Sequence, residues 1–182
     1  MLGALHRGTR MQGPSIAAVL CNPFGEEAAR AHRMYRVLSE QLARAGIPAL
    51  RFDFAGTGDS AGDVDAASVG GWVDDVICAV QEVTAKTKVK RIAVIGWRLG
   101  ATLAARAAER VAVHQLVLVD PVLDGRAYVQ ELRAQHRAYL QAEMGPRVGT
   151  LSSDECLGVR LTPELCDGLA GCDVFATAPL SQ

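Results

Sequence analysis

The chain has 182 residues, with 19 Lys and Arg against 20 Asp and Glu and a formal net charge of −1 at pH 7. This length fits one domain with a sizeable core. The balanced charge offers no basic surface for nucleic acid or an anionic membrane, so we expect a small molecule or another protein as the partner. No apolar run approaches the roughly 20 residues that span a bilayer. Residues 1–14 lack the apolar block of a signal peptide, and we therefore expect a cytoplasmic protein.

The cysteines give no support for a disulfide framework or a metal site. Their number is odd and no CxxC pair occurs, so we expect free thiols at all five positions: Cys21, Cys78, Cys156, Cys166 and Cys172. No histidine lies near the last three in the sequence, and their spacing matches no familiar zinc pattern. We expect neither a bound metal nor a cofactor.

The first half of the chain alternates strands and helices. Residues 15–22 form a short apolar run, typical of a buried strand. A helix that ends at Gly46 follows, with one apolar face at spacings of three and four: Ala31, Met34, Tyr35, Leu38 and Leu42. Residues 47–54 predict a second strand, and the turn-rich residues 55–60 come directly after it.

The alternation continues with the clearest amphipathic helix of the chain. Its apolar stripe runs from Val69 to Val83, and Asp65 or Ser68 can cap its start. Strands at 92–95 and 116–119, with a helix at 99–108 between them, complete the pattern. This order predicts an α/β fold with a mainly parallel sheet, helices on both faces and ligands at the carboxyl ends of the strands.

The C-terminal part gives a weaker pattern. Residues 127–144 and 163–169 look helical, and we expect no further strand in residues 145–182. We accordingly divide the chain into an N-terminal segment (1–14), an α/β core (15–124) and a cap-like helix with a poorly defined tail (125–182). Because the outer edges of such an incomplete sheet would be exposed, we expect pairing with another chain, giving a homodimer.

A nucleophile-elbow pattern, Gly96-Trp97-Arg98-Leu99-Gly100, joins the strand at 92–95 to the helix at 99–108. The two glycines suit the strained strand-to-helix turn on which such a nucleophile stands. Arg98 occupies the nucleophile's place. A guanidinium is always protonated, so Arg98 excludes the ordinary serine mechanism at this position.

Four segments together resemble the serine aminopeptidase-like branch of the α/β-hydrolase superfamily: residues 20–27, 32–36, 51–60 and 96–101. Within that branch they are most similar to hydrolases associated with the exosortase A system, some of which also carry Arg at the elbow. The resemblance covers residues 15–132. It implies an α/β-hydrolase core with its C-terminal strands incomplete, and nominal hydrolysis of an ester, thioester or amide.

The resemblance also implies an oxyanion hole built from the backbone N–H groups of Phe24 and Leu99. The alternative is that Pro23 and Gly25 simply form a turn.

Neither a base nor an acid is placed as the family requires. None of the four histidines, His6, His32, His114 and His136, occupies the expected position near the C-terminus. Asp120 or Asp124 could stand near the site as the acid, because both follow the carboxyl end of a strand. Two hypotheses follow. The chain is a hydrolase that uses an unrecognised group or belongs to a longer parent chain, or it is an inactive binding module for an acyl or anionic ligand or a partner protein.

Arg98 has two interpretations. Above the N-terminus of the helix at 99–108, its charge would favour an anionic ligand. Alternatively, and in our preferred interpretation, it forms an ion pair with one of the acids whose segments end at the same sheet edge: Glu26, Glu27, Asp53 or Asp59.

A dinucleotide site is a minor alternative. Residues 56–61 match the pattern GxGxxA, but in a dinucleotide-binding unit a helix opens within this motif, and here the apolar stripe begins only at Val69.

Overall fold

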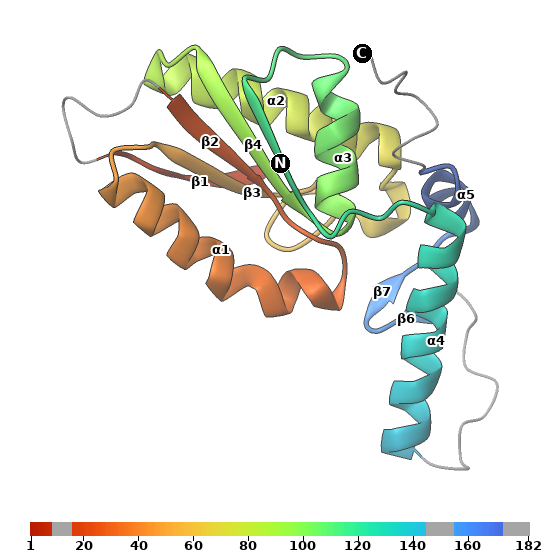
Figure 1. Ribbon diagram of the computed structural model, residues 1–182. Coiled ribbons are helices and arrows are strands. Elements are labelled where there is room, and N and C mark those ends of the chain that lie inside the picture. The colour runs from red at the N-terminus through yellow and green to blue at the C-terminus, as the bar shows by residue number, and fades with distance from the viewer. Residues whose placement is uncertain (9–15, 145–154, 173–182) are drawn as a thin grey trace.

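The computed structural model describes residues 1–8, 16–144 and 155–172. Its centre is a five-stranded sheet in the order β1-β3-β2-β4-β5 (Figure 1). The strands are β1 (Leu2–His6), β2 (Ile16–Cys21), β3 (Ala49–Asp53), β4 (Arg91–Trp97) and β5 (Gln115–Val119). Strands β3, β2, β4 and β5 are parallel, and β1 is antiparallel to β3. The predicted α/β fold with a mainly parallel sheet is confirmed.

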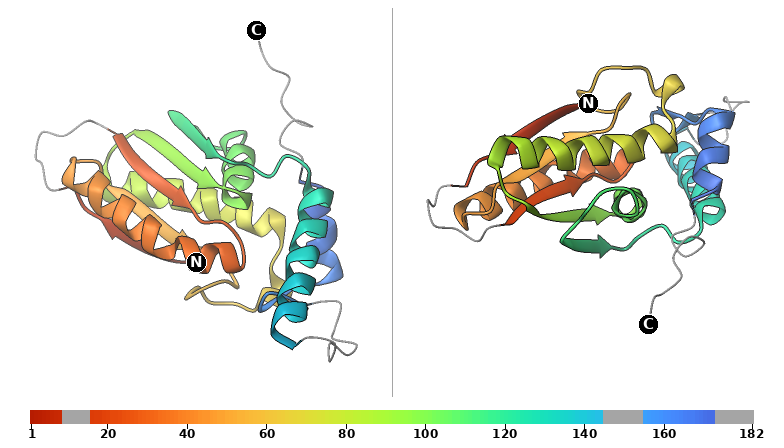
Figure 2. Two further views of the ribbon diagram at one scale, coloured as in Figure 1. Left: turned by 60° about the horizontal axis from the view of Figure 1, so that its bottom comes forward. Right: turned by 90° about the horizontal axis from the view of Figure 1, so that it is seen from above.

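Helices cover both faces of the sheet (Figures 1 and 2). Successive residues of a strand face opposite sides, and β2 illustrates this division. Val19 packs in the core beneath α2 (Val69–Thr87) and α3 (Leu99–Ala108), whereas Leu20 packs with residues of α1 (Glu26–Arg44). The sheet therefore has two apolar layers, of which the one beneath α2 and α3 is larger.

Side-chain caps fix where several helices begin. The Ser68 hydroxyl accepts a hydrogen bond from the Gly71 N–H at 3.1 Å, so Ser68 rather than Asp65 caps α2. Asp65 instead lies in a short 3₁₀ turn, η1 (Val64–Ala66). Thr162 caps α5 (Pro163–Ala170) in the same way, through the Leu165 N–H at 3.1 Å.

The chain after β5 packs beside the carboxyl ends of the strands (Figure 1). It consists of α4 (Gly125–Met144), a two-stranded ladder of β6 (Glu155–Cys156) and β7 (Val159–Arg160), and α5. Helices α4 and α5 touch closely, because a Cβ added at Gly125 would lie 1.8 Å from the Leu169 carbonyl oxygen. Tyr128 of α4 belongs to the same apolar cluster as the sheet.

Three features differ from the sequence-based expectations. Strand β1 lies in residues 1–14, where no strand was expected, and the β6–β7 ladder contradicts the expectation of no further strand after residue 145. The partner of β1, strand β3, is distant in sequence, whereas β6 and β7 pair with each other and have only two residues each. Met34 is 46% exposed, whereas Tyr35, Ser39 and Ala43 are buried, so the buried face of α1 is rotated away from Met34.

In the part of the chain that the structure describes, no helix is long and apolar enough to cross a bilayer.

Candidate functional site

Arg98 stands in the strained turn between β4 and α3. Its backbone angles, φ 53° and ψ −124°, are rare for a residue with a side chain. The two flanking glycines are sterically required. A Cβ at Gly96 would lie 2.5 Å from the Ala101 Cα, and one at Gly100 would lie 2.2 Å from the Asn22 carbonyl oxygen. The turn therefore has the geometry of a nucleophile elbow, with a guanidinium as its side chain.

The Arg98 guanidinium is held by three carboxylates. Nε donates to Glu27 Oε1 at 3.0 Å and Nη2 donates to Glu131 Oε2 at 2.8 Å, while Nη1 lies 3.4 Å from Asp120 Oδ2. Its carbon Cζ lies 5.4 Å from the centre of the Tyr128 ring. The side chain is only 15% exposed. We call these five residues the Arg98 cluster.

Burial and charge act in opposite directions within the Arg98 cluster. Burial opposes the charge on Arg98, but its hydrogen bond to Glu131 and the attraction of Glu27 outweigh this and raise the pKa of Arg98. Burial also raises the pKa of Glu27, and the neighbouring guanidinium offsets this only in part. Three carboxylates facing one guanidinium leave the elbow with an excess of negative charge.

The ion-pair interpretation of Arg98 is therefore correct for Glu27, but not for Glu26, Asp53 or Asp59. Glu26 pairs with Arg30, and the Asp53 carboxylate accepts from Asn22 and from the backbone of Asp59. The alternative, an unpaired cation that attracts an anion, does not fit a guanidinium already surrounded by carboxylates.

Sequence reasoning missed Glu131 and Tyr128. Both lie on the predicted helix, three residues apart and hence on the same face. No pattern in the sequence predicts the direction of this helix, α4, relative to the elbow. Asp120 was expected near the site, and the structure puts its carboxylate against Arg98, whereas Asp124 caps α4 by accepting from the N–H groups of residues 126 and 127.

The segments that contain Phe24 and Leu99, which were expected to form an oxyanion hole, are in direct contact. A Cβ added at Gly100 would overlap the Asn22 carbonyl oxygen. Phe24 and Leu99 are both buried. Neither the Phe24 N–H nor the Leu99 N–H donates a hydrogen bond to another described residue. Both N–H groups are therefore without a partner among the described residues, and Phe24 also lines the neighbouring cavity.

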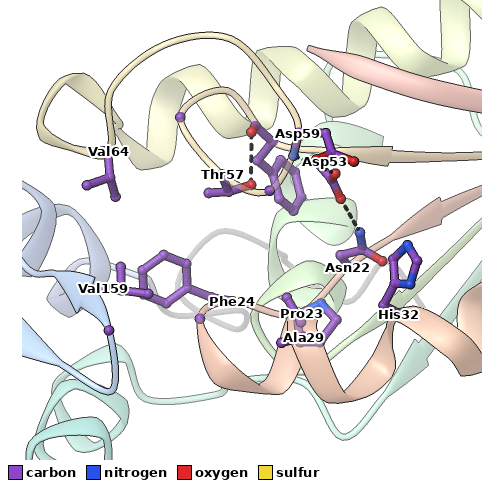
Figure 3. Close-up of a pocket in the computed structure, with 16 residues that line it drawn as sticks. Asn22, Pro23, Phe24, Ala29, His32, Asp53, Thr57, Asp59, Val64 and Val159 are labelled. Carbon is purple, nitrogen blue, oxygen red and sulfur yellow. Dashed lines mark hydrogen bonds between the residues drawn. The ribbon is translucent and has the colours of Figure 1, made fainter.

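A cavity of about 570 Å³ opens beside this corner, between the start of α1, the loop after β3 and the β6–β7 turn (Figure 3). Phe24, Val64 and Val159 give it an apolar wall. Asn22 lies at its inner side, where its Nδ2 donates to the Phe52 carbonyl at 2.9 Å. That bond fixes the amide, and the buried Asn22 Oδ1 has no partner among the described residues.

The loop at residues 56–61 is a structural turn rather than a dinucleotide site. Gly58 is required because a Cβ there would lie 2.5 Å from Asp53 Oδ2, and its φ is 52°. The Ser60 hydroxyl donates to the Asp53 carbonyl and accepts from the Leu2 N–H, both at 2.6 Å, which ties the loop to β1. No helix opens within the motif, because α2 begins only at Val69.

All four histidines of the chain lie in described segments, and each contacts a group outside the Arg98 cluster. His6 and His32 both lie 3.3 Å from nitrogens of Arg51, and His114 lies 2.7 Å from Arg91 Nη2. His136 Nδ1 accepts from the Leu157 N–H at 3.1 Å. The described residues contain no histidine in contact with the elbow.

No group of three or more His, Cys, Asp or Glu side chains in the described ranges could hold a metal ion. The five cysteines are free thiols, and Cys21, Cys156 and Cys172 are buried. Burial raises the pKa of the Cys21 thiol, which makes it a poor nucleophile.

The comparisons with known proteins agree with this architecture. The family model described as serine aminopeptidase, S33, matches residues 13–157. The chain belongs to this family. No curated protein matches it significantly.

Solved structures support the α/β-hydrolase fold of this S33 family member. An alpha-beta serine hydrolase homologue from Coxiella burnetii is 24% identical with a TM-score of 0.54, and the match covers 65% of this chain and 56% of that one. A proline iminopeptidase from Mycobacterium smegmatis is 18% identical with a TM-score of 0.52, covering 78% and 50%. An esterase from Pyrococcus furiosus is 23% identical with a TM-score of 0.52, covering 74% and 52%. The chain thus spans about half the length of these structures.

Proposed function

We propose that the protein is a non-catalytic member of the S33 family that binds an acyl compound without cleaving it. The observation that carries the proposal is the Arg98 cluster. The nucleophile's place is filled by a guanidinium that Glu27 and Glu131 hold in position, and a protonated guanidinium cannot attack a carbonyl carbon. With every histidine engaged elsewhere, no imidazole contacts the elbow to act as a general base.

The ligand we propose is neutral. The free N–H groups of Phe24 and Leu99 can donate to an acyl oxygen, and the neighbouring cavity has an apolar wall that suits a short chain. A carboxylate ligand would meet the excess negative charge of the Arg98 cluster, and Asp53 and Asp59 also line the cavity. We therefore favour an ester or amide over a free acid.

Ligand-observed NMR with methyl hexanoate and with hexanoate tests this choice. We expect binding of the ester and none of the acid. Val159→Phe, which fills the cavity, should abolish binding of the ester, whereas Val37→Phe, at an exposed position of α1, should leave it unchanged. Binding of hexanoate alone would contradict the proposal.

A second candidate is hydrolysis, favoured by the retained elbow geometry and the two free N–H donors. A fluorophosphonate probe and 4-nitrophenyl butyrate distinguish the two. We expect neither labelling nor turnover by the purified protein. Labelling that persists in Arg98→Ala would identify another nucleophile and would rule out the non-catalytic proposal.

We also propose that the protein is most similar to the hydrolases associated with the exosortase A system and that it is cytoplasmic. Both rest on sequence patterns alone.

A further inference from the structure

The cavity beside the elbow has two unlike sides (Figure 3). Phe24, Val64 and Val159 form its apolar wall, whereas polar side chains gather at Asn22 and on residues 53–59, the loop at the end of β3. None of the described residues that line the cavity is Lys or Arg. The polar side therefore carries no permanent positive charge.

The side-chain donors on this polar side are already used within the protein. Asn22 Nδ2 donates to the Phe52 carbonyl at 2.9 Å and to Asp53 Oδ1 at 3.1 Å, which occupies both of its hydrogens. The Thr57 hydroxyl donates its one hydrogen to the Phe54 carbonyl at 2.9 Å. What these side chains can still offer to a ligand is therefore oxygen that accepts.

His32 is a lining residue of another kind. Its Nε2 lies 3.3 Å from Arg51 Nη1, and because arginine can only donate, this nitrogen accepts. The hydrogen of the neutral ring is therefore on Nδ1, and His32 keeps a donor. This donor extends from α1 and not from the loop at residues 53–59.

Acceptors on the loop side outnumber the donors that reach them. Asp53 Oδ2 accepts from the Asp59 N–H at 3.1 Å, so each oxygen of Asp53 already has one donor. The Thr57 oxygen and the Asp59 carboxylate accept no hydrogen bond from another described residue. The buried Asn22 Oδ1 also lacks a partner among the described residues. A ligand that excludes water from this side has to supply the donor itself.

We infer that the ligand of this cavity carries a hydrogen-bond donor, an N–H or an O–H, that faces Thr57 and Asp59. This inference rests on the proposed function and narrows it, because the acyl oxygen is assigned to the Phe24 N–H across the cavity (Figure 3). A plain ester fills the apolar part but leaves the loop oxygens without a partner once water is displaced. A site that accepts a hydrogen bond discriminates against an analogue that lacks the donor. An amide N–H and the hydroxyl of an alcohol group are the two neutral sources.

Matched pairs of ligands test the inference and separate the two sources. N-Methylhexanamide and N,N-dimethylhexanamide differ by one N–H, and 2-hydroxyethyl hexanoate and 2-methoxyethyl hexanoate differ by one O–H. The Kd values are measured by NMR titration of the full chain. We expect the donor-bearing member of at least one pair to bind about fivefold tighter or more than its partner, and that pair identifies the source.

The ligand series also distinguishes failure of this inference from failure of the proposed function. Equal binding within both pairs would overturn the inference and leave the proposed function intact. If no compound binds, methyl hexanoate included, the proposed function has failed and the inference fails with it.

A double variant locates the contact. Thr57→Val with Asp59→Ala removes both acceptors, and we expect it to bind the two members of each pair equally. The control is Thr84→Val with Glu143→Ala, which should keep the preference. Thr84 donates to a backbone carbonyl as Thr57 does, Glu143 is exposed, and neither lines the cavity.

A preference that persists in the folded Thr57→Val/Asp59→Ala variant contradicts the inference. If this double variant does not fold, Asp59→Ala alone provides the comparison, because Asp59 is exposed and its carboxylate supports no other described residue. Asp59→Ala should reduce the preference, and an unchanged preference would then exclude the assignment.

Discussion

The Arg98 guanidinium lies 5.4 Å above the Tyr128 ring, so the elbow at the end of β4 is joined directly to the first turns of α4. The Glu131 carboxylate, one turn further along α4, accepts a hydrogen bond from Arg98 Nη2 at 2.8 Å. The Arg98 side chain therefore connects the sheet to the helix that packs beside the carboxyl ends of its strands.

Replacing Arg98 by alanine should lower stability. It leaves the half-buried Glu27 carboxylate without its cation, at a cost of about 1–3 kcal/mol. Urea unfolding measures the change. Arg30→Ala removes only the exposed pair with Glu26 and should cost less than about 0.5 kcal/mol. Binding of methyl hexanoate should survive in Arg98→Ala, and equal stability of the two variants would contradict this role of Arg98.

Replacing Gly100 by alanine should prevent folding or destabilise the chain by more than about 4 kcal/mol, because the new methyl group would overlap backbone oxygens of Cys21 and Asn22. Circular dichroism of the purified Gly100→Ala variant shows whether it folds, and its thermal unfolding measures its stability. Gly70 in the first turn of α2 is the matched control. Nothing lies within 4 Å of a Cβ there, so Gly70→Ala should be neutral or stabilise by up to about 1 kcal/mol.

Stability should decrease as the pH falls below about 6.5. Burial and then the charge of Arg51 lower the pKa of His6 in the folded protein below the ordinary value of 6.5. The unfolded chain therefore binds more protons in this window, and protons favour unfolding. The contribution of His6 is complete above pH 6.5 and is lost as the pH falls through the lowered pKa. His6→Asn should flatten this part of a plot of unfolding free energy against pH, and an unchanged slope would exclude His6 as the cause.

Replacing Ser60 by alanine should loosen β1. The hydroxyl bridges the Leu2 N–H and the Asp53 carbonyl, and its loss should cost about 1–2 kcal/mol. Hydrogen exchange of the β1 amides should accelerate more than that of β4. The neighbouring Ala61→Ser change, at an exposed position, should alter stability by less than about 0.5 kcal/mol. Equal acceleration in both strands would indicate global destabilisation instead.

The core of the fold was predictable because its signals are local. Helix α3 has the predicted bounds, 99–108, since the elbow glycines and the alanine-rich run fix both ends. The Arg98 cluster was only partly predictable. Its contacts with α4 depend on the chain direction after β5, where Asp120 has a φ of 46°. The β6–β7 ladder was missed for another reason, because two residues in each strand are too few to show an alternating pattern.

The Arg98 cluster also bears on how this protein can evolve. A change of Arg98 to serine would leave three carboxylates around an uncharged hydroxyl, with no cation to balance them. Their negative charge would oppose the oxyanion that acyl transfer must form. Arg98, Glu27 and Glu131 therefore depend on one another, and a change at any one of them made first would weaken the present protein. A change at position 98 is therefore tolerated best when the acids around it change at the same time.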